Sequence, residues 1–105
     1  MTTEELIRME PTLFSELLLT FDANTCERHA RKIVTMLGGP TFDSYLQSMT
    51  DIVISNALSG KHDVEPYFQQ TENLFPGVLP DTNLYEKLTG LTLLAIALRL
   101  ENKLK

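Results

Sequence analysis

The chain has 105 residues, of which 43% are hydrophobic and 22% are charged, and its formal net charge at pH 7 is −5. This composition is too apolar for a disordered chain, and the length predicts one helical domain over residues 1–105 with a core of modest size. The negative charge argues against broad binding to nucleic acid or to anionic membranes, because both attract positively charged proteins.

The first 21 residues, "MTTEELIRMEPTLFSELLLTF", have the pattern of helices. Thr2 and Glu5 have the spacing of a capping box, and Pro11 is expected to begin a second helix, because a proline inside a helix costs about 3 kcal/mol. Charged residues interrupt the apolar ones, so the segment does not have the pattern of a signal peptide. The side chains expected to face the core are Leu13, Leu17 and Phe21, with Phe14 and Leu18 beside them.

Two longer helices follow. The first is predicted over residues 24–37, with Asn24 as its cap and the pair Gly38 and Gly39 as its stop. The second is predicted to be capped by Thr41 and to end at Gly60. It contains "DIVIS", which is β-branched and typical of a short strand, but the helical periodicity through it is longer and favours a helix.

Residues 61–83 are less regular. Asp63 is expected to cap a short helix with Pro66 in its first turn, and "FPGVLPD" is expected to form a turn whose apolar residues Phe75, Val78 and Leu79 lie on the helices. Large aromatic residues in or beside a loop often contribute to binding. The predicted partner-binding residues here are Tyr67, Phe68 and Phe75. The alternative is that these rings close one end of the core.

The last helix, opened by Asn83 and Glu86, is apolar on two sides. One side has the spacing of a core face and comprises Leu84, Leu88, Leu91, Leu94, Ala95 and Leu98. The opposite side carries Glu86 and Thr89 first, and then becomes apolar at Leu93, Ile96, Ala97, Leu100 and Leu104. The apolar run is about ten residues, which is too short for a membrane span of roughly 20. The helix is therefore either central in a monomer or part of an interface.

We expect an interface, because a chain of this size can surround a central helix only partly. The preceding helix also has apolar residues off its main face, at Ile54 and Leu58. Each large apolar side chain left in water forgoes roughly 1.5 to 3 kcal/mol. The predicted interface of a homodimer consists of Leu93, Ile96, Ala97, Leu100, Leu104, Ile54 and Leu58.

Two other functions have some support in the sequence. Cys26 and His29 are three residues apart on one helix, so they could share a metal ion with Asp22, or act as nucleophile and base. Cys26 is the single cysteine, which excludes an internal disulfide and fits a reducing, cytoplasmic compartment. The simpler interpretation is a core thiol beside a boundary histidine, so no metal site is predicted.

Arg28, Arg31 and Lys32 form one local cluster of positive charge on the opposite side of the same helix. They are candidates for contact with a partner protein or, as a further alternative, with nucleic acid. A solvated helix face explains them equally well.

The sequence therefore predicts an all-α bundle of four to five helices with an apolar C-terminal helix. The function that fits best is a small acidic protein-interaction module: an adaptor, an assembly factor or chaperone, or an inhibitor of a larger protein. Its expected partners are a second copy and a protein with a basic surface, with no membrane contact. No catalytic residue or cofactor is predicted.

Overall fold

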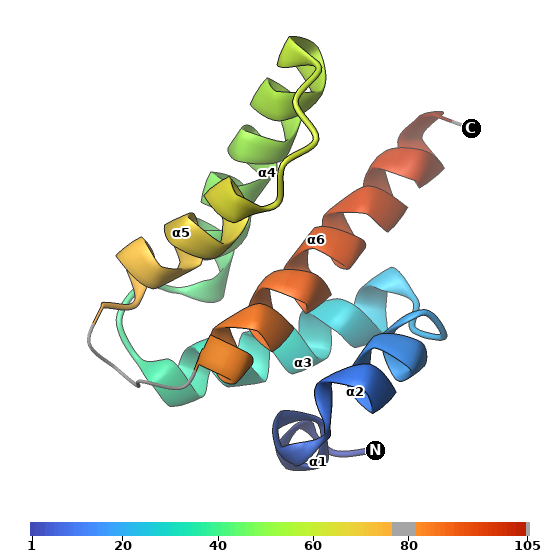
Figure 1. Ribbon diagram of the computed structural model, residues 1–105, viewed down its shortest axis with the longest axis vertical. Coiled ribbons are helices and arrows are strands. Elements are labelled where there is room, and N and C mark those ends of the chain that lie inside the picture. The colour runs from blue at the N-terminus through green and yellow to red at the C-terminus, as the bar shows by residue number, and fades with distance from the viewer. Residues whose placement is uncertain (77–81, 105) are drawn as a thin grey trace.

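The computed structural model describes residues 1–76 and 82–104, which form six α-helices (Figure 1). The helices are α1 (Thr3–Arg8), α2 (Pro11–Leu18), α3 (Ala23–Leu37), α4 (Phe42–Ser59), α5 (Glu65–Leu74) and α6 (Thr82–Leu104). The all-α prediction is confirmed, and residues 51–55 lie inside α4 as expected. The described residues form six helices, close to the four to five predicted, and the first segment divides at Pro11 as expected.

Local sequence signals set most of the helix ends. The Thr2–Glu5 capping box forms, Pro11 lies in the first turn of α2, and Thr41 caps α4. Gly38 and Gly60 follow α3 and α4 with φ angles of 75° and 71°, a backbone conformation that favours glycine.

Two predicted caps are wrong. The N-cap of α3 is Asp22, whose carboxylate accepts a hydrogen bond from the Thr25 backbone at 2.8 Å. The side chain of Asn24 instead accepts a hydrogen bond from Arg99 of α6 at 2.9 Å. Helix α5 begins after Val64, with no side-chain cap from Asp63. Val78 and Leu79 lie outside the described residues.

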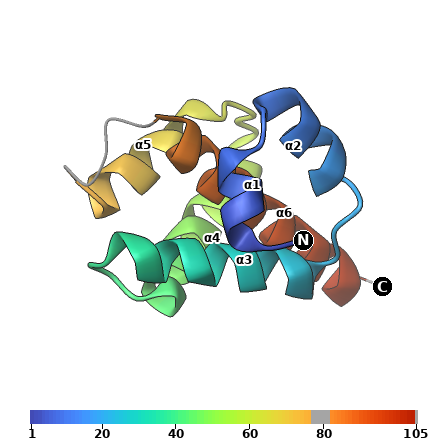
Figure 2. The same cartoon turned by 90° about the horizontal axis from the view of Figure 1, so that it is seen from below.

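Helix α6 lies at the centre of the bundle. Helix α3 packs along it most extensively, α5 and α4 pack on another side, and α2 on a third (Figures 1 and 2). The buried side chains of the six helices form a single cluster. The predicted core face of α6 is buried at Leu84, Leu88, Leu91 and Ala95.

The N-terminal half of α6 is buried on nearly every side, including polar positions. Thr89, expected on the open side, is buried where α5 packs on α6, and its hydroxyl forms a hydrogen bond with Thr71 of α5 at 2.9 Å. Thr71 also bonds to the Tyr45 hydroxyl of α4 at 2.8 Å. Burial raises the pKa of Tyr45, which stays protonated and can donate. These three hydroxyls join three helices inside the core.

The core face of α2 differs from the prediction. Phe14 is buried, whereas Leu13 is 53% exposed and Leu17 is half-buried. The Phe14 ring lies 5.6 Å from the ammonium nitrogen of Lys87, so α2 is rotated to bury the larger side chain against α6. Phe21 lies beyond the end of α2 and stacks on His29 of α3.

Lys87 attaches α1 to α6. It is only 2% exposed, and its Nζ atom donates hydrogen bonds to the carbonyl oxygens of Ile7 at 2.7 Å and Met9 at 2.5 Å. These carbonyls belong to the C-terminal end of α1, where a positive charge is favourable. At the other end of α1, the buried hydroxyl of Thr3 forms a hydrogen bond with His29 at 2.8 Å.

Candidate functional site

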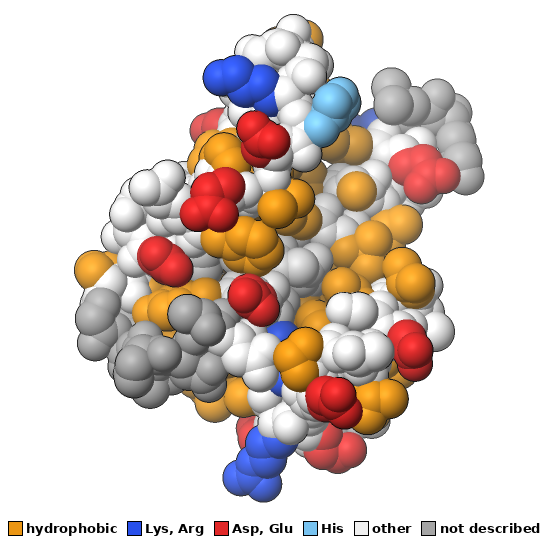
Figure 3. Space-filling view, in the orientation of Figure 1, with side chains coloured by type: hydrophobic (Ala, Val, Ile, Leu, Met, Phe, Trp, Pro, Cys, Tyr) orange, Lys and Arg blue, Asp and Glu red, His pale blue; other side chains and the backbone are white. Residues whose placement is uncertain are grey.

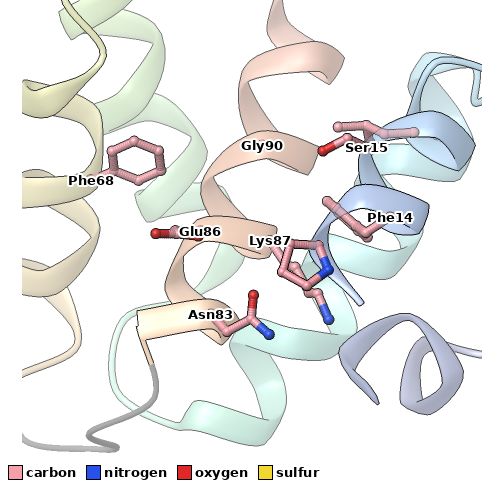
Figure 4. A pocket seen from close by; sticks show the side chains of 9 residues that line it. Phe14, Ser15, Phe68, Asn83, Glu86, Lys87 and Gly90 are labelled. Atoms are coloured by element: carbon pink, nitrogen blue, oxygen red, sulfur yellow. The ribbon is translucent and has the colours of Figure 1, made fainter. Parts of the chain in front are cut away.

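A cavity of about 230 Å³ opens on the side of α6 that faces away from α3, between α2 and α5 (Figure 4). We call it the α6 groove. Gly90 and Glu86 of α6 lie between Phe68 of α5 on one side and Phe14 and Ser15 of α2 on the other. The complete lining is Pro11, Phe14, Ser15, Leu18, Phe68, Asn83, Glu86, Lys87 and Gly90. The walls are therefore largely aromatic and aliphatic.

Gly90 forms the floor of the groove, and neither the backbone nor the packing requires a glycine there. Its φ is not positive, and a Cβ atom built on it would lie 3.6 Å from Leu18 and 3.9 Å from Phe14, both ordinary contact distances. A glycine inside a helix costs about 0.5 to 1 kcal/mol relative to alanine. The absent side chain leaves open the space that the groove occupies.

The exposed charges around the groove are acidic. Glu86 lines the cavity, while Glu65 and Glu72 lie one helical turn on either side of Phe68 in α5 and are exposed. Helices α2 and α5 contain no lysine or arginine. Lys87 reaches the lining, but it is buried and donates hydrogen bonds to the carbonyl oxygens of Ile7 and Met9, so its role is structural.

The predicted interface on α6 continues the same face. Leu93 and Ala97 follow Gly90 at the third and seventh positions, which places them on the same side of the helix. Ala97 is exposed, and Leu93 and Leu100 are half-buried against the core. Ile96 is buried, so it belongs to the core of a single subunit. The Leu104 side chain lies outside the described residues. The predicted interface on α6 is thus only partly covered within one chain.

The C-terminal halves of α4 and α6 diverge (Figure 1). Hydrophobic side chains line both sides of the hollow between them (Figure 3). On α4, Ile54 is 44% and Leu58 is 85% exposed, because the buried face of this helix ends with Met49. Ala57 is exposed as well. Both predicted interface residues of α4 are therefore accessible.

The three aromatic candidates occupy different places. Phe68 lies at the groove. Tyr67 is half-buried, and its hydroxyl accepts a hydrogen bond from Asn56 at 3.1 Å. Phe75 is 1% exposed and packs edge-on against Tyr45, with ring centroids 5.5 Å apart. Its prediction as a partner-binding residue is wrong, and it closes the core as the alternative stated.

The basic cluster lies apart from the groove, on the outer side of α3. Arg28, Arg31 and Lys32 are all exposed. Arg31 forms an ion pair with Asp43 at 3.4 Å, and its guanidinium lies 4.7 Å from the centroid of the Phe42 ring. Arg31 therefore has intramolecular partners on α4.

Cys26 and His29 are both buried in the core. Burial raises the pKa of the Cys26 thiol to about 11, which keeps it protonated and unreactive at neutral pH. His29 is engaged by Thr3 and stacks on Phe21 with ring centroids 5.6 Å apart. Within residues 1–76 and 82–104, no three His, Cys, Asp or Glu side chains are grouped as metal ligands would be. The structure gives this pair a packing role.

Sequence reasoning found Phe68 but missed Gly90, Glu86 and Phe14 as parts of one site. A glycine inside a predicted helix is a signal that could have indicated the groove. In the part of the chain that the structure describes, no helix combines the length and the hydropathy of a membrane span. Comparison of the chain with protein-family models, curated proteins and solved structures finds no match.

Proposed function

We propose that the protein is an interaction module that binds another protein through the α6 groove. The observation that carries this proposal is the groove itself: an open apolar cavity between three helices, with a glycine floor that the packing does not require. Leu93 and Ala97 extend the same face toward the C-terminus. A module of this kind acts as an adaptor, an assembly factor or chaperone, or an inhibitor that covers part of a larger protein.

The residues that line the groove suit contact with another protein better than catalysis. Its walls are mainly Phe14, Leu18 and Phe68, and Glu86 is the exposed charged group in its lining. A nucleophile would need a neighbouring base and an orienting group. The thiol that could serve, Cys26, is buried in the core.

A photo-crosslinking experiment tests this function. A benzophenone amino acid is placed at Ala97, on the groove face, or at Lys32, on the outer side of α3, and the full chain is irradiated in its source cells. We expect adducts at position 97 that are absent at position 32. They should disappear when Gly90→Met fills the groove. Equal adducts at both positions, or none at either, would contradict the proposal.

Self-association is a second candidate function, favoured by the exposed side chains of Ile54 and Leu58 on the C-terminal half of α4. A dimer through the ends of α4 and α6 would bury Leu58, Ile54 and Ala97. The pair of substitutions Leu58→Glu and Ala97→Glu changes exposed positions, so the fold should survive. Light scattering should then show a dimer for the wild type and a monomer for the variant. Met36→Glu, an exposed apolar residue of α3, is the matched control.

A further inference from the structure

The shape and the charge of the α6 groove together indicate what kind of partner it accepts. We propose that it receives an amphipathic helix with basic residues beside its apolar face, and that one large apolar side chain of this helix enters the cavity above Gly90. This inference rests on the proposed function and names the class of partner.

The size of the cavity fits a single large side chain. An apolar cavity of about 150 Å³ accepts a benzene ring, and the groove measures about 230 Å³. Phe14 and Phe68 supply apolar surfaces on its two sides, and Gly90 leaves the floor open (Figure 4). A leucine, methionine or phenylalanine of the partner can therefore be enclosed on three sides.

The length of the open face fits a helix. Ala97 lies seven residues after Gly90, with Leu93 between them, which corresponds to about 10 Å along α6 or two helical turns. A helix that docks in a groove uses apolar anchors at the same spacing, every three or four residues. Two turns of a partner helix can therefore lie along α6, with the anchor side chain directed into the cavity.

The charge distribution selects a basic helix. Glu86 lies at the cavity, and Glu65 and Glu72 flank Phe68, so basic residues one turn from the anchor would meet carboxylates. No cation on α2 or α5 opposes them. In a twofold dimer through this face, the groove of a second copy would bring Glu65, Glu72 and Glu86 toward the same carboxylates. The groove is therefore better suited to a basic partner than to itself.

The test measures the affinity of the full chain for two labelled peptides by fluorescence anisotropy. Both peptides have about 15 residues, long enough for an isolated helix to form in part. Both carry leucine on one face, with lysine on the other face in one peptide and glutamate in its match. We expect the lysine peptide to bind at least about tenfold more tightly, with an affinity that falls as salt is added.

Variants of the chain locate the binding site. Gly90→Met should weaken binding of the lysine peptide about tenfold, because its side chain occupies the cavity. Joint replacement of Glu65, Glu72 and Glu86 by glutamine should weaken it and reduce the salt dependence. Glu16→Gln is the matched control, since Glu16 is exposed on α2 but lines a separate surface with Leu13. Circular dichroism confirms folding, and Gly90→Ala, whose methyl group fits, is used if Gly90→Met does not fold.

Three results would overturn the inference. The two peptides could bind alike; the lysine peptide could bind folded Gly90→Met as well as wild type; or the wild type could form a dimer that Gly90→Met abolishes, in which case a second copy occupies the groove. Adducts at position 97 to a protein other than a second copy, together with any of these results, would leave the proposed function standing. Loss of both the adducts and the peptide binding would remove the function and the inference together.

Discussion

Replacing Gly90 by alanine should stabilise the protein. The residue lies inside α6, with a helical backbone and room for a Cβ atom at 3.6 Å from Leu18. Alanine gains about 0.5 to 1 kcal/mol from helix propensity, and the added methyl group contacts α2. We expect an increase of about 1 kcal/mol in the free energy of unfolding. For a domain of about 100 residues this raises Tm by roughly 4 °C.

The assay is urea unfolding followed by far-UV circular dichroism, with Gly60→Ala as the matched control. Gly60 ends α4 with a φ of 71° and has no neighbouring atom within 4 Å of a built Cβ, so only its backbone conformation matters. Alanine there should lose about 1 kcal/mol. The same substitution is thus expected to raise the free energy of unfolding at position 90 and to lower it at position 60. A loss of stability in Gly90→Ala would show that the packing of α2 on α6 requires glycine, and the argument for the groove would fail.

Three further predictions concern the core. Burial lowers the pKa of His29 below its usual value of 6.5, so the unfolded chain binds a proton on this residue more readily than the folded chain. The free energy of unfolding should therefore be unaffected by His29 above pH 6.5 and should decrease as the pH falls below 6.5. In urea unfolding at several pH values, His29→Gln should reduce this dependence, and His62→Gln should not. Thr71→Val should cost about 2 kcal/mol in unfolding experiments, because Thr71 bonds to the buried hydroxyls of Tyr45 and Thr89 and its loss removes a partner from both. An unchanged free energy of unfolding would contradict the network. Cys26, buried and with its pKa raised to about 11, should react with iodoacetamide only after unfolding, so rapid alkylation of the native protein would refute its placement.

Local signals in the sequence predicted the helices well, because each depends on neighbours in the chain. The Thr2–Glu5 capping box and the stop at Gly60 are examples, since a side chain reaching three residues along or a single φ angle decides each of them. The cap at Asn24 failed for the opposite reason. Arg99, 75 residues away in sequence, donates a hydrogen bond to the side-chain oxygen of Asn24. The spacing of residues around Asn24 gives no sign of that contact.

The candidate site was predicted only in part. Apolar periodicity identified the second face of α6, and the aromatic content of α5 identified Phe68. Periodicity does not say which neighbours cover a face, so Ile96 and Ala97 received the same prediction, although one is buried and the other exposed. The burial of Thr89 could likewise not be predicted from the sequence pattern, because its hydrogen-bond partner belongs to another helix.

The attachment of α1 by Lys87 has a consequence for synthesis on the ribosome. The ammonium group that satisfies the carbonyl oxygens of Ile7 and Met9 comes from a residue about 80 positions later in the chain. At translation rates of about 5 to 20 residues per second, α1 waits on the order of ten seconds for this partner. During that interval the carbonyl oxygens of Ile7 and Met9 lack this donor, so a nascent chain stalled before α6 should be cleaved readily by protease within α1. Helix α1 is thus made long before the residue that completes its hydrogen bonds.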